Sequence, residues 1–141
     1  MANYVLIIGD RLENIPKTFN PINKVDDVYE TNDNREITIY TFGKKTHIKH
    51  PNCEIIFDLT KYLYDTNSNK QNGIDNNVQK EIIKNKHFTI LLEKIVKIIE
   101  KYDIHKLGLM CNSGNYCSVA WAELIKKIYY NKAKLEHLNI K

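Results

Sequence analysis

The sequence predicts an α/β fold, a three-layer sandwich around a mainly parallel sheet, built as a single domain from residues 1–141. Short apolar runs of strand length alternate along the chain with segments whose apolar residues recur at helical spacing. In residues 106–130 an apolar run, a small polar loop and a helical pattern follow one another directly. A chain of 141 residues with 43% hydrophobic residues can also bury a core of its own.

Strands are expected wherever a short run is continuously apolar or rich in β-branched and aromatic residues. Residues 36–42 alternate in the way that a half-buried strand does, whereas residues 53–59 are apolar enough for a buried one. Residues 10–34 are polar and irregular, apart from a short edge strand predicted at 25–30. The main strands are therefore expected at residues 3–9, 36–42, 53–59, 106–111 and 132–138.

Helical patterns predict three helices. The first runs from about residue 77 to residue 84 and can be capped by Asp75 or Asn76. The second runs from residue 87 or 88 to residue 102, and the third begins near Cys117. In the second helix the predicted buried face consists of Leu91, Leu92, Ile95, Ile98 and Ile99, and the predicted solvent face of Glu93, Lys94, Lys97, Glu100 and Lys101.

The charge composition does not by itself identify a partner. The net charge is +4, but only Arg11 and Arg35 among the 21 basic residues are arginines. Because asparagine, isoleucine and lysine are common throughout, the lysine excess indicates a solvated surface rather than a nucleic-acid footprint. No apolar stretch has the length of a membrane span, so we expect no membrane partner.

The cysteines and histidines do not predict a metal site. Cys53, Cys111 and Cys117 are an odd number without a CxxC pair, which argues against a disulfide framework and a structural zinc site. The five histidines lack metal-ligand spacing. We therefore expect no metal, no cofactor and a reducing, cytoplasmic location.

The strand–loop–helix segment at residues 106–130 is the strongest candidate for a functional site. Such an arrangement points backbone N–H groups at an anion, and Gly114 can adopt a positive φ there. In a parallel sheet, ligands bind at the carboxyl ends of the strands, where Gly43, Asp58 and Cys111 are expected to meet. Lys44 and Lys45 follow Gly43 and could contact a phosphate as point charges.

Cysteine chemistry at the same loop is an alternative. Cys111 stands where a strand leads into a helix, a position that lowers the pKa of a thiol, and it is the weak candidate for a catalytic nucleophile. However, a cysteine phosphatase loop would need an arginine where this chain has Cys117. An inert, buried strand-end residue is the simpler interpretation of Cys111, and packing that of Cys117. Tyr116 could stack on a base or sugar.

Four ordered stretches resemble the C-terminal domain of the RapZ family. They are Thr41-Phe42-Gly43-Lys44-Lys45, Phe57-Asp58-Leu59, Gly73-Ile74-Asp75-Asn76-Asn77-Val78 and the loop with its helix from Cys111 to Glu123. His137-Leu138 is similar to the family's closing His-Arg pair. The resemblance covers residues 36–141, while residues 1–35 form an N-terminal strand and extension outside it.

The resemblance implies an α/β domain that binds a phosphorylated amino sugar. It also implies that bacterial members form oligomers, which bind a small regulatory RNA. The resemblance does not extend to the family's nucleotide-binding domain, so it does not imply ATP hydrolysis. The family arginines are replaced by Thr60 or Lys61, Cys117 and Leu138, and the loop histidine by Tyr116. The expected ligand-binding residues are Gly43, Lys44, Lys45, Asp58, Cys111, Asn112, Ser113, Gly114, Asn115, Tyr116, Cys117, Ser118 and His137.

Three functions stay open at this point. The first is a noncatalytic module that binds a phosphorylated small ligand, such as a sugar phosphate or a nucleotide-like molecule, and/or RNA. The second is a cysteine-dependent hydrolase that uses Cys111. The third is a protein-interaction domain with a degenerate pocket, whose partner could be a second copy of the chain in a homo-oligomer.

Overall fold

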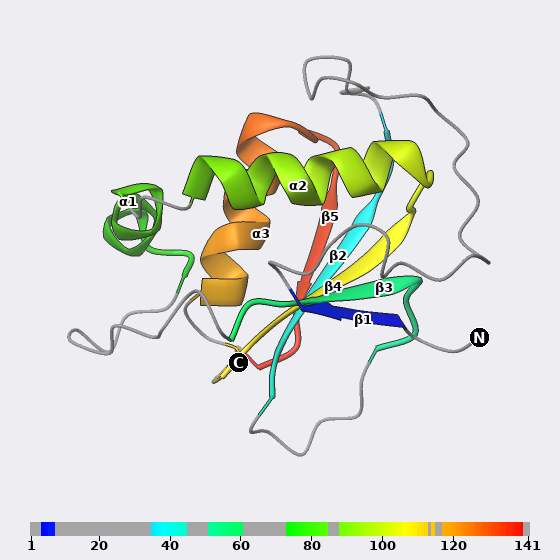
Figure 1. The fold of residues 1–141 in the computed structure, drawn as a ribbon. Helices are drawn as coiled ribbons and strands as arrows, with labels where there is room; N and C mark the ends of the chain where they lie inside the picture. Colours follow the sequence, from blue (N-terminus) through cyan, green and yellow to red (C-terminus); the bar gives the residue numbers. More distant parts are fainter. Residues whose placement is uncertain are drawn as a thin grey trace.

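The computed structural model describes residues 4–7, 35–44, 51–60, 73–84, 88–112, 114 and 117–139. Within these residues the chain forms five strands and three helices (Figure 1). In chain order they are β1 (Tyr4–Ile7), β2 (Thr38–Gly43), β3 (Ile55–Asp58), α1 (Asn76–Lys84), α2 (Phe88–Lys101), β4 (Lys106–Cys111), α3 (Cys117–Ile128) and β5 (Lys134–His137).

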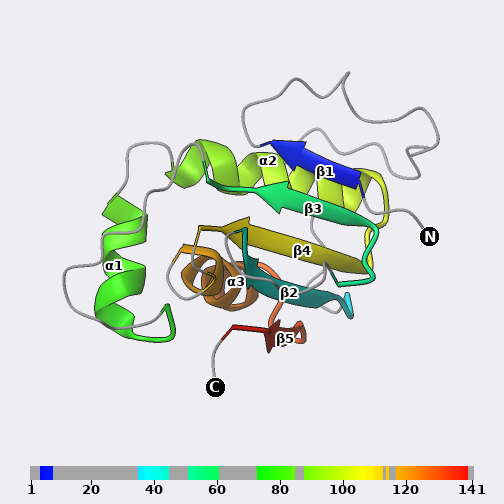
Figure 2. The same ribbon diagram turned by 90° about the horizontal axis from the view of Figure 1, so that it is seen from below.

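The strands form one parallel sheet in the order β1-β3-β4-β2-β5, which confirms the predicted α/β fold with its parallel sheet (Figure 2). The central strand β4 pairs with β2 from Thr38 opposite Lys106 to Gly43 opposite Cys111. Parallel neighbours require crossover connections, and α1 with α2 forms the connection from β3 to β4. All carboxyl ends of the strands therefore lie at one edge of the sheet.

Helices α2 and α3 pack against the same face of the sheet (Figures 1 and 2). Their apolar residues form the main core with alternating strand residues such as Ile39, Phe57 and Leu109. A smaller buried cluster of Phe42, Cys53, Ile56 and Met110 belongs to the opposite face. Because the described helices that pack on the sheet lie on one face, a helical layer on the second face stays a prediction.

The predicted elements agree closely with the observed ones where both can be compared. The five main strands and the three helices that were expected are present within the described part of the chain, with ends that differ by three residues or fewer. The edge strand predicted at residues 25–30 lies outside the described residues. No helix in the ranges that the structure describes combines the length and hydropathy needed to cross a bilayer.

Helix α1 lies beyond the carboxyl ends of the strands and is held there by specific polar contacts (Figure 2). Asp75 caps the helix, because its Oδ1 accepts a hydrogen bond from the Asn77 N–H at 2.7 Å. Gln79 is buried and its Nε2 donates to the Gly73 carbonyl at 2.9 Å, while Lys127 of α3 donates to its Oε1 at 2.7 Å. These bonds connect α1 to α3, whose first turn adjoins the candidate site.

One residue that the helical pattern places in solvent is buried. Glu100 was expected on the solvent face of α2, but it is only 3% exposed. Its Oε2 accepts hydrogen bonds from the Tyr130 hydroxyl at 2.6 Å and from Arg35 Nε at 3.0 Å. Burial and the bond to Glu100 raise the pKa of Tyr130, so the phenol stays protonated and donates. The prediction was wrong because helical spacing gives only the direction of a side chain, not what covers it.

The same arginine also contacts Asp103 in the turn before β4. Arg35 donates to Asp103 Oδ1, and Asp103 adopts a φ of 52°, a left-handed conformation that aspartate and asparagine tolerate better than most residues. The hydrogen bond from Arg35 lowers the pKa of Asp103. This interaction therefore joins the start of β2 to the end of α2 in a pH-dependent way.

We predict that Asp103→Asn destabilises the fold at neutral pH but not in acid. Because the folded-state pKa lies below the unfolded value of about 3.9, the contribution of Asp103 is present above about pH 4 and is lost as the pH falls further. Urea midpoints at about pH 6 and about pH 3 should therefore show a gap between parent and variant that closes on acidification. Glu81→Gln, which removes an exposed carboxylate, is the control and should show no such gap. A gap for Asp103→Asn that does not change with pH would contradict this assignment.

Candidate functional site

The carboxyl ends of β2, β3 and β4 meet at one edge of the sheet, as the sequence predicts. Gly43 is paired with Cys111, and Asp58 is paired with Met110 one residue earlier in β4. The Lys44 N–H donates to the Cys111 carbonyl at 2.7 Å. The three ends are thus fixed relative to one another by main-chain hydrogen bonds, which makes this edge a rigid base for a site.

Gly114 fixes the loop that leads from β4 to α3. Its φ is 78°, in the left-handed region, as its position in the polar loop suggests. A Cβ atom at this residue would lie 2.5 Å from the Gly43 nitrogen and 2.4 Å from Asn139 Oδ1. Asn139 Oδ1 in turn accepts a hydrogen bond from the Gly43 N–H at 2.8 Å. Gly114 therefore packs directly on the end of β2, at a point where only glycine fits.

Cys111 is an internal connection of the loop rather than an exposed thiol. Its side chain is fully buried, and its Sγ donates to Ser118 Oγ at 3.1 Å while it accepts from the Gly114 N–H at 3.2 Å. Strand, loop and helix α3 are joined through this one sulfur atom. Cys117 is also buried and belongs to the main core, which confirms its predicted packing role.

Asp58 serves the turn after β3. It is 5% exposed, and its Oδ1 accepts hydrogen bonds from the Thr60 N–H at 2.9 Å and the Thr60 hydroxyl at 2.6 Å. Thr60 is one of the two residues that replace a family arginine in the resemblance. Among the described residues, the Thr60 hydroxyl is therefore the side-chain group that hydrogen-bonds this carboxylate.

His137 is the centre of a side-chain hydrogen-bond network that the sequence did not indicate. Its Nδ1 lies 2.8 Å from Thr41 Oγ1, and its Nε2 lies 2.9 Å from Glu123 Oε2 of α3. An ionised carboxylate only accepts hydrogen bonds, so these partners assign the hydrogen to Nε2 and leave Nδ1 facing the Thr41 hydroxyl. This hydrogen-bond network joins β2, β5 and α3, with Thr41 fully buried and His137 and Glu123 half-buried. Its members are too far apart in sequence for a spacing pattern to reveal them.

The remaining predicted site residues divide into two groups. Lys44 is exposed at the end of β2, and Asn112 is half-buried at the start of the loop. Lys45, Ser113, Asn115 and Tyr116 lie outside the described residues. The structure thus brings Gly43, Cys111, Gly114 and Ser118 into direct contact. It places Asp58 at the neighbouring strand end and His137 in β5, paired with Thr41.

Within the residues that the structure describes, no cluster of three or more histidine, cysteine, aspartate or glutamate side chains is arranged to hold an ion.

Comparisons with known proteins give no further identification. No protein-family model, curated protein or solved structure matches this chain. The resemblance to the RapZ C-terminal domain therefore stays a prediction from the sequence.

We predict that Gly114→Ala destabilises the fold by at least about 2 kcal/mol. The left-handed conformation costs a residue with a Cβ atom about 1–2 kcal/mol, and the contacts with neighbouring atoms add an overpacking cost. Urea unfolding would measure the loss. Since the new Cβ atom would also meet the backbone of Gly43, removing the Asn139 side chain as well should not restore stability. A Gly114→Ala variant as stable as the parent would contradict the described loop conformation.

Proposed function

We propose that this protein is a noncatalytic module that binds the phosphate group of a small phosphorylated molecule at the carboxyl edge of its sheet. The observation that carries the proposal is the packing of Gly114 on the backbone of Gly43. This contact places Gly114, which lies between β4 and the start of α3 in the chain, against the end of β2. The resemblance to a family that binds a phosphorylated amino sugar supports the same choice of ligand.

Main-chain groups would supply most of the recognition. Helix α3 has 12 residues, and the first N–H groups of any helix lack intrahelical acceptors and carry partial positive charge. A phosphate held there needs no particular side chain, which fits a loop without arginine.

Among the residues that the structure describes, Lys44 is the cation best placed to assist. It is exposed directly after Gly43, and its own N–H is bonded to Cys111, so its backbone is fixed beside the loop. Arg35 cannot take this role, because it lies before the start of β2 at the other edge of the sheet and binds Glu100 and Asp103. A lysine makes a point-charge contact rather than a bidentate one. Binding should therefore be weaker than in a site built from arginines.

Burial at the loop favours binding over cysteine catalysis. The Cys111 thiol is fully buried and engaged with Ser118 and Gly114, whereas a nucleophile must reach a substrate. We therefore place the thiol among the groups that hold the loop in shape.

We expect glucose 6-phosphate and AMP to raise the melting temperature, and glucose and adenosine to have no effect. A ligand that binds only the folded state stabilises it in proportion to its occupancy. Lys44→Met should weaken the affinity for these phosphates about tenfold, and Ser113→Asp should abolish binding by charge repulsion. Lys80→Met, which changes an exposed lysine on α1, is the matched control and should behave like the parent.

Two results would count against this proposal. If none of the phosphorylated compounds stabilises the protein, the hypothesis of a protein-interaction domain with a degenerate pocket is favoured instead. If a short RNA binds at low salt while the small phosphates do not, the ligand class is wrong.

A further inference from the structure

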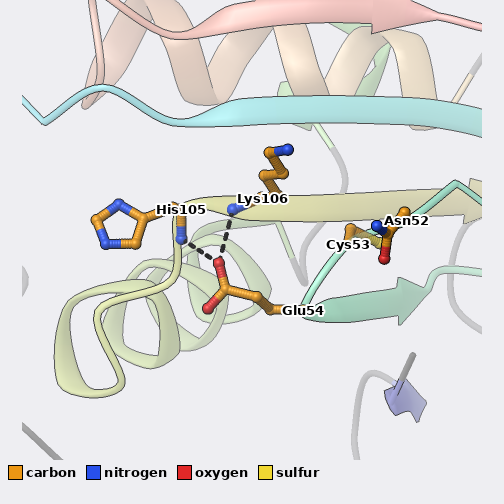
Figure 3. Close-up of a pocket in the computed structure, with 5 residues that line it drawn as sticks. All are labelled: Asn52, Cys53, Glu54, His105 and Lys106. Atoms are coloured by element: carbon orange, nitrogen blue, oxygen red, sulfur yellow. Dashed lines mark hydrogen bonds between the residues drawn. The ribbon is translucent and has the colours of Figure 1, made fainter. Parts of the chain in front are cut away.

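A pocket of about 280 Å³ lies at the edge of the sheet opposite the proposed phosphate site. It is formed where β3 and β4 begin and is lined by Asn52, Cys53, Glu54, His105 and Lys106 (Figure 3). Its volume lies just below the usual range for small-molecule sites, about 300–1,000 Å³. A ligand for it would have the size of a metabolite with few heavy atoms.

The Glu54 carboxylate is held in a defined position in this pocket. Its Oε1 accepts hydrogen bonds from the backbone N–H groups of His105 at 2.8 Å and Lys106 at 3.0 Å. The Glu54 N–H also donates to the Lys106 carbonyl at 2.9 Å, which continues the pairing of β3 with β4. Among the described residues, no group donates to the second oxygen, Oε2. One carboxylate oxygen is thus fixed and the other is available to a ligand.

Lys106 stands opposite Glu54 in the pairing of β4 with β3, but its ammonium group does not form an ion pair with the Glu54 carboxylate. No ion pair joins Lys106 to an acidic side chain within the described ranges, although Glu54 stands opposite it on the neighbouring strand. Figure 3 shows the Lys106 side chain extending away from the Glu54 carboxylate. The pocket therefore presents two separated charges of opposite sign.

The other lining groups carry little competing charge. Cys53 is 2% exposed, and desolvation raises the pKa of its thiol to about 11, so it is a neutral, weakly polar wall at physiological pH. His105 Nε2 lies 3.3 Å from Asp103 Oδ2, which provides its acidic partner outside the pocket lining. Asn52 is exposed and contributes an amide that can donate or accept.

From these observations we propose that the pocket binds a small zwitterion of the α-amino-acid class. The ligand's carboxylate would contact Lys106 Nζ, its ammonium group Glu54 Oε2, and its side chain the Cys53 wall. A simple anion would meet repulsion from Glu54, and a simple cation would meet repulsion from Lys106. Only a molecule with both charges satisfies both residues, and complementary charge is what gives such sites their specificity.

Titration of the ¹⁵N-labelled protein with L-valine tests this proposal. The amides of His105 and Lys106, which bond to Glu54, should shift saturably, while the amide of Glu136 in β5 should not. Isovalerate and isobutylamine are valine without its ammonium group and without its carboxylate, and each should bind about tenfold more weakly or worse. Equal binding of either half-molecule, or no saturable shift with L-valine, would overturn the proposal.

Two variants locate the ligand's charges. Glu54→Gln keeps an oxygen that can accept from the two N–H groups but removes the negative charge. Lys106→Met removes the ammonium group and keeps an apolar side chain of similar length. Each should weaken valine binding about tenfold or more. Lys134→Met and Glu136→Gln remove a surface ion pair on β5 and are the matched controls, with no expected effect on binding. If a pocket variant fails to fold, the comparison of valine with its two half-molecules on the parent protein still decides.

Discussion

The parallel pairing of β2 with β4 is the interaction on which the rest of this structure depends. It runs in register from Thr38 opposite Lys106 to Gly43 opposite Cys111. A shift of one residue would turn the buried side chains of either strand to the opposite face. The same register places the loop containing Gly114 at one edge of the sheet and the pocket beside Lys106 at the other. Both proposed sites are therefore consequences of one strand alignment.

Buried polar groups on the helical side reinforce this alignment. At the amino edge, where the strands begin, Glu100 of α2 accepts hydrogen bonds from Arg35 and Tyr130. Closer to the carboxyl ends of the strands, His137 connects Thr41 with Glu123. Buried polar groups without partners are costly, so arrangements that separate these residues are disfavoured. The two networks thereby help to specify where α2, α3 and the edge strand β5 lie.

The two edges of the sheet differ in the chemistry that they offer. At the carboxyl edge, the Cys111 thiol before α3 and the Asp58 carboxylate at the end of β3 are already occupied by internal hydrogen bonds. At the amino edge, Glu54 and Lys106 present opposite charges that do not pair with each other. We therefore propose an anion recognised by backbone N–H groups at the first edge and a ligand that carries both charges at the second.

The sequence by itself determined the local elements, because strand-length apolar runs, helical spacing and the Asp75 cap each act over a few neighbouring residues. It also predicted that Gly43, Asp58 and Cys111 meet at the carboxyl ends of the strands, since parallel strands end at a common edge. It could not reveal the burial of Glu100, the chain from Thr41 through His137 to Glu123, or the pocket between Glu54 and Lys106. Those features join residues distant in sequence, and only the tertiary structure decided which of them meet, because packing and hydrogen bonding between separate elements set their distances.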